Sequence, residues 1–308
     1  MDNPFSPSLF QPYSNFNNLT IVVPTLGKHL SSHWIANILE LASMSVHIYI
    51  ILPPNYDPSE TDLLFNISCS NISIYVSSFR GQVAQRLYGF SLVRTEFVLQ
   101  LDDDVIIESM TLSSLLRYLS LSESPLAISP LIKNPRLSFS SQSKRNPLYQ
   151  VRNALLYCSF SPISGKISKS GFPVPITPNQ FSSLQSVSWL PGCCVLYRTK
   201  NIYHSNYFPF SGKAYCEDLI HSFNLLKNGV SLVVATDLYI QTPIASFIDF
   251  TPRQFAEYIK NDYLVRSHFV RITSNNIYLM HISYFFIILS FVLRTIFIGC
   301  SSVFQKLL

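Results

Sequence analysis

Apolar residues in the first half of the chain fall into short runs separated by stretches of helical periodicity. The runs at residues 19–25, 46–52, 72–77, 96–101 and 126–132 are rich in β-branched and aromatic side chains, which is typical of buried strands. Residues 30–43, 81–93 and 110–121 repeat apolar side chains every three to four positions and predict helices, and a short helix is expected over 58–65. This alternation predicts an α/β fold with a mostly parallel sheet flanked by helices.

The pattern changes between residues 133 and 186, where Ser, Pro and Asn dominate and no period is sustained. We expect an irregular segment there, either a functional loop or an ordered connector. A strand pair or bent strand is expected over 187–198, a helix from about 214 to 226 that ends at Asn228–Gly229, and a last strand over 231–236. Residues 1–18 are expected to be a loosely ordered lead-in without a secretory signal. One domain is expected over residues 19–250.

The C-terminal region, residues 251–308, is expected to be helical. Arg253, Lys260, Arg266 and Arg271 precede an apolar segment at 277–300, and about 20 apolar residues suffice to cross a bilayer. Its one Arg, Arg294, lies near one end and can snorkel. A spanning helix, a helix lying in the interface and a helix docked on the domain are all open. The basic flank predicts that the protein lies at the cytoplasmic face of the cell membrane.

The composition supports contact with a membrane and otherwise changes this picture little. The 308 residues are 48% hydrophobic and 13% charged, with a mean hydropathy of +0.25, which favours membrane contact. The net charge of +5 suits anionic partners, but no Lys/Arg tract with interleaved aromatic residues is present, so nucleic acid is not expected. The six cysteines form neither a CxxC pair nor a disulfide-rich spacing, which indicates a reducing compartment.

Three successive carboxylates, Asp102, Asp103 and Asp104, follow the strand at 96–101. Two such charges about 4 Å apart repel each other by roughly 4 kcal/mol at an effective dielectric constant near 20. A hard divalent cation with oxygen ligands would relieve this repulsion. Open α/β sheets bind ligands at the carboxyl ends of their strands, where this triplet would lie. The alternative is a solvated acidic turn.

Four features then stand in a particular order: a first strand ending in Pro-Thr, the GQVAQRLYG helix, the LDDDV strand end with its DxD pattern, and the CED helix start. Their order and spacing, over about residues 19–237, resemble the inverting family 2 glycosyltransferases of the bacterial polysaccharide- and glycan-synthesis type. The resemblance implies the GT-A fold, which is a Rossmann-like fold for nucleotide-diphospho-sugars.

The resemblance also implies a donor site and a metal site. Pro24, Thr25 and Leu26 match the loop that lines the nucleoside. Arg86 matches an Arg that faces the base and the phosphate, with a solvated helix face as its alternative. Asp104 would ligate Mg²⁺ or Mn²⁺, whereas Asp102 and Asp103 would contact the waters of the metal or the ribose, and Asp102 is a second candidate ligand. The nearest acidic residue after the second strand is Asp57, so base recognition cannot be assigned.

The resemblance further implies a catalytic pair and an acceptor side. Asp218 matches the general base that takes the proton of the acceptor hydroxyl, and Glu217 would support it. Two acids that only complement a helix dipole are the alternative. Trp189 and Gly192 match an acceptor-side wall, although Trp189 is as easily a core residue. The family often has a metal-ligating His after its last strand, but Gln241-Thr242-Pro243 stands there in this chain.

These observations favour a metal-dependent inverting glycosyltransferase. It would move a sugar from a nucleoside-diphosphate donor to a glycan acceptor, a lipid-linked one in our interpretation, at a membrane surface. A sugar nucleotidyltransferase is the rival enzyme, but Pro24-Thr25-Leu26-Gly27-Lys28 is a poor phosphate loop for that class. The non-enzymatic rival is an inactive membrane-attached binding or scaffold protein. The sequence specifies neither the donor, the acceptor nor the oligomeric state.

Overall fold

The computed structural model describes residues 15–27, 30–56, 69–133, 147–178, 182–205, 208–210, 214–242 and 250–307. The chain divides into two compact units. The first comprises residues 1–135 and 178–250, and the second comprises 136–177 and 251–308. The helix expected over 58–65 and Asp57 lie outside the described residues.

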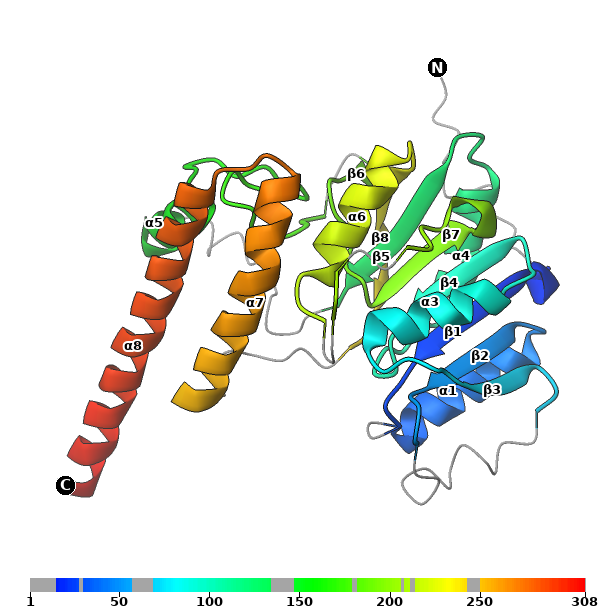
Figure 1. The fold of residues 1–308 in the computed structure, drawn as a ribbon, viewed down its shortest axis with the longest axis horizontal. Helices are drawn as coiled ribbons and strands as arrows, with labels where there is room; N and C mark the ends of the chain where they lie inside the picture. The colour runs from blue at the N-terminus through cyan, green and yellow to red at the C-terminus, as the bar shows by residue number, and fades with distance from the viewer. Residues whose placement is uncertain are drawn as a thin grey trace. The chain divides into compact units, whose positions relative to one another are not determined.

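The first unit is built on an eight-stranded sheet in the order β3-β2-β1-β4-β7-β5-β8-β6 (Figure 1). Six strands run in one direction, and β7 and β6 run opposite to their neighbours. The strand bounds are β1 Leu19–Pro24, β2 His47–Leu52, β3 Ile72–Val76, β4 Phe97–Leu101, β5 Leu126–Ile132, β6 Leu184–Ser186, β7 Cys194–Arg198 and β8 Ser231–Ile240. The predicted mostly parallel α/β sheet is therefore confirmed.

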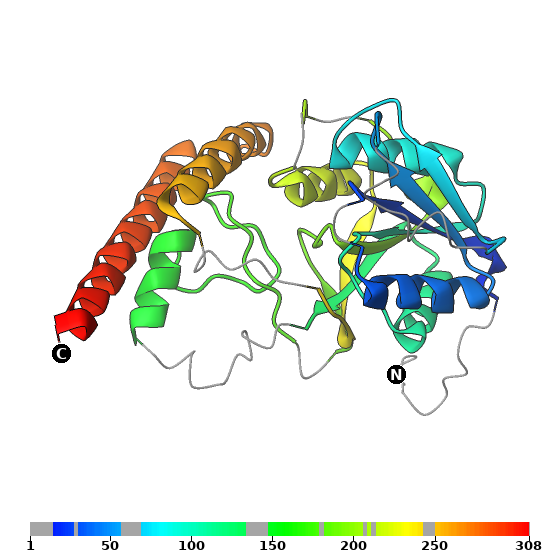
Figure 2. The same ribbon diagram turned by 90° about the horizontal axis from the view of Figure 1, so that it is seen from below.

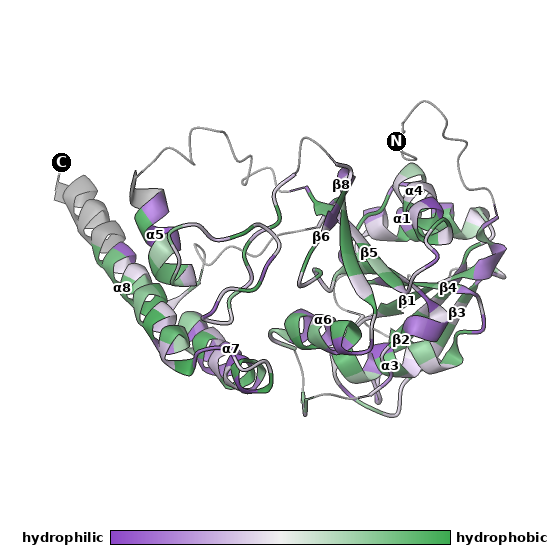
Figure 3. Cartoon of the chain, turned by 90° about the horizontal axis from the view of Figure 1, so that it is seen from above, coloured by the Kyte–Doolittle hydropathy of each residue, from purple (hydrophilic) through white to green (hydrophobic). Residues whose placement is uncertain are grey.

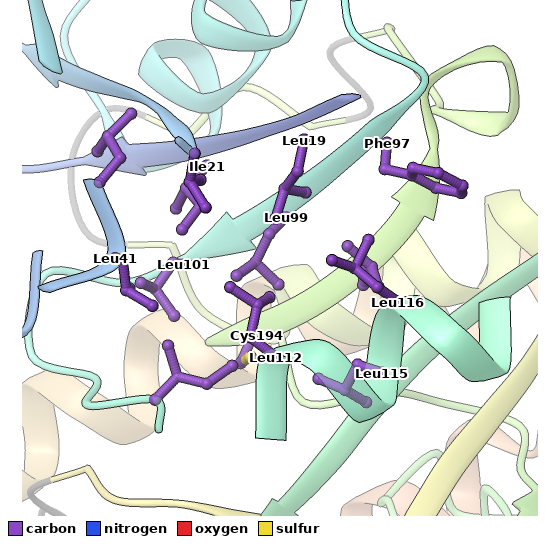
Figure 4. Close-up of a cluster of buried hydrophobic side chains, with 14 of the residues drawn as sticks. Leu19, Ile21, Leu41, Phe97, Leu99, Leu101, Leu112, Leu115, Leu116 and Cys194 are labelled. Atoms are coloured by element: carbon purple, nitrogen blue, oxygen red, sulfur yellow. The ribbon is translucent and has the colours of Figure 1, made fainter. Parts of the chain in front are cut away.

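Helices cover both faces of this sheet. Helices α1 (Ser32–Ser43) and α4 (Ser109–Ser120) lie on one face, and α3 (Gln82–Leu92) and α6 (Glu217–Lys227) lie on the other, as Figures 2 and 3 show. Ser31 accepts the backbone N–H of Trp34 and starts α1. The α1 and α4 side holds a continuous core in which Leu19, Leu99 and Cys194 meet Leu112 and neighbours (Figure 4).

The strand directions bring chemically important segments to one edge. Strands β1, β4 and β8 are parallel, so the residues that follow Pro24, Leu101 and Ile240 emerge at the same edge. Because β7 is antiparallel to β4, the turn before Cys194 reaches that edge too. The chain goes from β1 to β2 on one side and returns to β4 on the other, which makes the β1/β4 border a topological switch point, where α/β sheets bind ligands.

Three stretches differ from the sequence-based expectation. The irregular segment expected over 133–186 contains the helix α5 (Pro147–Tyr157) and the strand β6, so that prediction is wrong for those residues. Strand β8 continues to Ile240 rather than ending at residue 236. At the N-terminus, Phe16–Asn18 form a 3-10 turn and Phe16 is buried in the core, whereas we expected a loose lead-in over 1–18.

The second unit contains α5, α7 (Pro252–Ile272) and α8 (Ile277–Leu307). Thr251 begins α7 with a reciprocal capping box to Gln254. Residues 136–177 thus cluster with the C-terminal helices, although the sequence suggested one domain from 19 to 250. Within the described residues, one helical segment, Ile277–Ile296, is long and apolar enough to cross a membrane. Only 17% of its most apolar stretch is buried inside the protein.

A buried ion pair lies at the centre of the second unit. Arg266 donates two hydrogen bonds to the Asp262 carboxylate, at 2.9 and 3.1 Å, and one to the Gly171 carbonyl, at 2.8 Å. The Tyr284 hydroxyl also donates to Asp262, and the guanidinium of Arg266 lies 4.1 Å from the Phe172 ring centroid. Buried charges are tolerated when they are paired and hydrogen-bonded in this way.

Candidate active site

The acidic triplet begins where β4 ends, at the border with β1. Thr25, directly after β1, donates its hydroxyl hydrogen to the Asp103 carboxylate and accepts the backbone N–H of Gly27 at 2.9 Å. The side chain of Asp104 is exposed, whereas Asp102 and Asp103 are half-buried. The structure therefore brings the predicted donor loop and the predicted metal-binding triplet together at the switch point.

Arg86 connects this triplet to the second acidic pair. The side chain projects from α3 and is 3% exposed. Its Nη1 donates to both carboxylate oxygens of Glu217 at 2.9 Å, and its Nη2 donates to Asp102 Oδ1 at 3.2 Å. The alternative of a solvated helix face for Arg86 is wrong, because two carboxylates from distant segments enclose the guanidinium. Charge-assisted pairs of this type fix geometry as well as charge.

The turn before β7 forms a second connection between the acidic groups. The Cys193 carbonyl accepts the backbone N–H of Asp102 at 2.9 Å. A Cβ atom added to Gly192 would lie 2.7 Å from Glu217 Oε1 and 3.4 Å from Asp218 Cβ, so any larger residue there would require the Glu217 carboxylate to shift. The same turn thus touches the aspartate triplet on one side and the Glu217–Asp218 pair on the other.

The pKa values of this region reflect burial next to several negative charges. Burial raises the pKa of Asp102 to about 7; Arg86 opposes this rise, while Glu217 and the other two aspartates add to it. Burial also raises the pKa of the Cys193 thiol well above its usual range, and the charge of Asp102 adds to the shift, with smaller effects from Cys194, Asp104 and Asp218. The thiol therefore stays neutral at physiological pH.

A buried polar chain lies beneath the site. Gln100 donates to the Gly192 carbonyl, and its own carbonyl oxygen accepts the Tyr197 hydroxyl at 3.2 Å. That hydroxyl lies 3.1 Å from His221 Nε2 on α6. Burial lowers the pKa of His221 to about 4, so the imidazole is neutral at physiological pH. This chain holds the Gly192 turn and the first turns of α6 in one arrangement.

Two glutamines of α3 complete the edge. Gln85 is buried and donates to the carbonyls of Thr25 and Ile51, at 2.9 and 2.7 Å, so it ties the ends of β1 and β2 together. Gln82 donates to Asp102 Oδ1 at 3.3 Å. Neither glutamine was expected from the sequence to have a role, although amides on the same helix as Arg86 were a usable signal. Gln100, a polar residue in an otherwise apolar strand, was another.

The carboxylates fit one mode of divalent-cation binding. In the part of the chain that the structure describes, no three His, Cys, Asp or Glu residues group into a metal-binding cluster. Mg²⁺ is commonly held by one or two carboxylates together with the phosphates of a substrate, so a full protein cage is not required. The exposed Asp104 suits this mode. The Thr242 hydroxyl, after β8, lies 3.4 Å from Asp104 Oδ1, in the segment where the resemblance led us to look for a His ligand.

The other predicted residues lie around the same edge. Pro24 ends β1 and is buried, and Leu26 beyond it is 47% exposed. Trp189 is half-buried, and the next residue, Leu190, donates its backbone N–H to Ser222 of α6 at 3.0 Å. Asp218 is half-buried and accepts the Leu219 backbone N–H at 2.9 Å. The roles of these residues stay predictions.

The strand order and the helix layers define a GT-A fold. Mannosyltransferase PcManGT from Pyrobaculum calidifontis, in complex with GDP-Man and Mn²⁺, is similar over 98% of this chain and 84% of its own, with a TM-score of 0.52 and 12% identity. S. aureus TarS 1-349 in complex with UDP-GlcNAc is similar over 80% of this chain at 14% identity, with a TM-score of 0.46, and this chain spans 65% of that protein.

Glucosyl-3-phosphoglycerate synthase from Mycobacterium tuberculosis is similar over 80% of this chain and 78% of its own, with a TM-score of 0.45 and 11% identity. Neither a protein-family model nor a curated protein sequence matches this chain. Identities this low show a shared fold alone, so function has to be argued from the site.

Proposed function

We propose that the protein is a metal-dependent inverting glycosyltransferase. It would move a sugar from a nucleoside-diphosphate donor to a hydroxyl of a glycan acceptor. The observation that carries this proposal is the bridge by Arg86 between Asp102 and Glu217, which joins the two acidic clusters at one edge of the sheet. A shared edge is what a transfer needs, because the diphosphate leaves one face of the sugar while the acceptor attacks the other.

In this proposal the donor lies at the border of β1 and β4. Thr25, Pro24 and Leu26 line the nucleoside, and Asp103, held by Thr25, faces the ribose. Asp104 and, less directly, Asp102 would hold Mg²⁺ or Mn²⁺ with the diphosphate. When bound, such an ion neutralises charge on the leaving group. PcManGT, which has the same fold, contains GDP-Man and Mn²⁺, and this supports a nucleotide-sugar donor here.

Asp218 is the proposed general base. Its carboxylate would accept the proton of the acceptor hydroxyl as that oxygen attacks, a function that contributes about 10²–10⁴-fold to rate. Glu217 is fully engaged by Arg86 and is better suited to holding the start of α6 than to moving a proton. Arg86 then acts as a positioning residue between donor and acceptor sides. Trp189 would offer its ring to an acceptor sugar beside Gly192.

The acceptor is proposed to be lipid-linked, with the enzyme at the cytoplasmic face of the cell membrane. The apolar helix α8 and the basic residues before it support this location. An enzyme held on the membrane meets a membrane-bound acceptor at a raised effective concentration.

Donor turnover by the full-length protein tests the proposal. With Mn²⁺ and a panel of nucleotide sugars, we expect the wild type to hydrolyse or transfer from at least one donor. Asp104→Ala should lose donor turnover and weaken Mn²⁺-dependent binding of the nucleoside diphosphate. Asp218→Asn should keep that binding while losing turnover by at least about 10²-fold.

Glu123→Gln is the matched control, because Glu123 is an exposed acid outside the site and should leave turnover unchanged. Formation of a nucleotide sugar from a sugar phosphate and a nucleoside triphosphate would instead identify a nucleotidyltransferase. No turnover and no Mn²⁺-dependent nucleotide binding would favour the inactive scaffold.

A further inference from the structure

Helix α8 carries a straight line of exposed apolar side chains. At about 100° per residue, positions 278, 282, 285, 289, 292 and 296 fall within about 40° of one line along the helix. These six residues form the apolar stripe, and each is between 37% and 75% exposed: Tyr278, Ile282, Phe285, Leu289, Val292 and Ile296. Exposed apolar patches of this extent mark interaction surfaces.

The opposite face of α8 is buried within its own unit. Met280, Ser283 and Tyr284 are at most 4% exposed. Ser283 donates to the Leu156 carbonyl of α5 at 2.7 Å, and Tyr284 donates to Asp262 of α7. The stripe therefore faces away from α5 and α7, and Arg294 lies about 160° around the helix from Tyr278, off the stripe.

Helix α7 accompanies α8 along much of the candidate membrane segment. The rings of Phe255 and Phe291 stack with centroids 3.7 Å apart, and Tyr263 contacts both His281 and Tyr284. Phe255 and Tyr263 are separated by about two helical turns, as are Phe291 and Tyr284, so the helices run alongside each other in opposite directions.

This pairing is incompatible with α8 crossing a bilayer while the unit stays folded. Along the paired stretch, α7 exposes Arg253, Glu257 and Lys260. A spanning α8 would carry these three charges to membrane depth, where each is strongly unfavourable. A helix that lies in the plane of the interface keeps α7 in water and inserts only its apolar face.

The net charge of the second unit indicates which kind of lipid surface it binds. Residues 136–177 and 251–308 contain twelve Lys and Arg and two acidic residues, whereas the rest of the chain contains ten and fifteen. The positive net charge of the protein thus comes from this unit alone. A net positive charge attracts a protein to an anionic lipid surface over about a Debye length, and here that attraction acts on the unit that carries the apolar stripe.

We propose that the second unit is an interfacial membrane-binding module that lies on an anionic lipid bilayer, with α8 parallel to the surface and its apolar stripe among the headgroups. The inference rests on the membrane location in the proposed function, and it selects one of the orientations that the sequence left open. Helices α5 and α7 lie on the water side of α8.

Two adjacent residues of α8 test this orientation. Leu289 belongs to the stripe, whereas Ser290, also exposed, lies about 120° around the helix from Tyr278. With the full-length protein, we expect sedimentation with vesicles containing about one third phosphatidylserine, weak binding to pure phosphatidylcholine vesicles, and release by salt. Leu289→Asp should lower vesicle partitioning at least about 10-fold, and Ser290→Asp should stay within about 2-fold of the wild type.

Alkaline carbonate extraction of membranes containing the wild type provides a readout that does not depend on either variant folding. An interfacial module is released, and a spanning helix stays in the pellet. Retention in the pellet, or equal losses for both variants, would overturn the proposal in favour of a spanning helix. Absence of vesicle binding together with self-association would overturn it in favour of an interface between copies of the chain. Donor hydrolysis without vesicles is measured on the same preparation, so failure of membrane binding and failure of the proposed transfer activity are distinguished.

Discussion

His221 is a buried imidazole whose neutrality is part of the folded state. It lies on α6 beside the Tyr197 hydroxyl, with its pKa lowered from the usual 6.5 to about 4 by burial. Between these two pH values, the imidazole binds a proton in the unfolded chain but not in the folded chain. The free energy of unfolding therefore rises with pH across this window. The contribution of the neutral His221 is fully present above pH 6.5 and is lost as the pH falls through 4.

We expect the wild type to lose up to about 3 kcal/mol of unfolding free energy between pH 6.5 and 4 through this residue. His221→Gln should flatten that part of the stability curve, because an amide does not titrate. Denaturant melts at a series of pH values measure the slope. An identical slope in the variant would mean that His221 does not remain neutral in the folded protein.

Individual site residues were predictable to different degrees. The triplet Asp102–Asp104 and the pair Glu217–Asp218 were visible because carboxylates interrupt or follow apolar runs. The burial of Arg86 was not visible, because its partner Glu217 is 131 positions away and helix periodicity says nothing of such distant contacts. The same holds for Cys193, whose position depends on how two segments meet.

Among the elements, α3 approaches the sheet most closely at Gly89. A Cβ atom added there would lie 2.4 Å from Val22 Cγ1 and 2.9 Å from Ile51 Cγ1. Alanine would favour the helix by up to about 1 kcal/mol. The clash with two buried strands would cost more, about 1–3 kcal/mol as in other overpacked cores.

Gly89→Ala should therefore lower the melting temperature, despite the better helix former. Ser91→Ala is the matched control, because Ser91 is exposed on the same helix and should leave stability within about 0.5 kcal/mol of the wild type. A Gly89→Ala protein as stable as the wild type would show that α3 is packed less closely on β1 and β2 than in the structure.

The elements that the sequence predicted are those with strong local patterns. The core strands appear as apolar runs, so their existence and approximate bounds could be predicted. Strand β8 was expected to end at Thr236, but it continues through Asp237, which is exposed and accepts the Tyr118 hydroxyl at 2.9 Å. Helix α5 lies in a Ser- and Pro-rich context and packs on α8, and tertiary packing of this kind stabilises helices whose local signal is weak.

At the scale of the whole molecule, the division into two units could not be predicted from the sequence. The contacts that define the second unit join residues far apart in the chain, such as Gly171 with Arg266 and Leu156 with Ser283. Residues 133–186 show no sustained hydrophobic periodicity, so the sequence could not predict that part of this segment packs with the C-terminal helices. The opposite charge balance of the units becomes apparent only once this division is known.

We expect Asp104 and Asp218 to serve one donor–acceptor site at the carboxyl edge of the sheet. Anomalous diffraction from crystals grown with Mn²⁺ and a nucleoside diphosphate tests it most directly. We expect a Mn²⁺ peak within about 2.5 Å of an Asp104 oxygen. The diphosphate should lie between the aspartate triplet and Asp218, beside the turn at Gly192 and Cys193. A peak remote from Asp104, or a diphosphate bound away from the β1/β4 border, would contradict it.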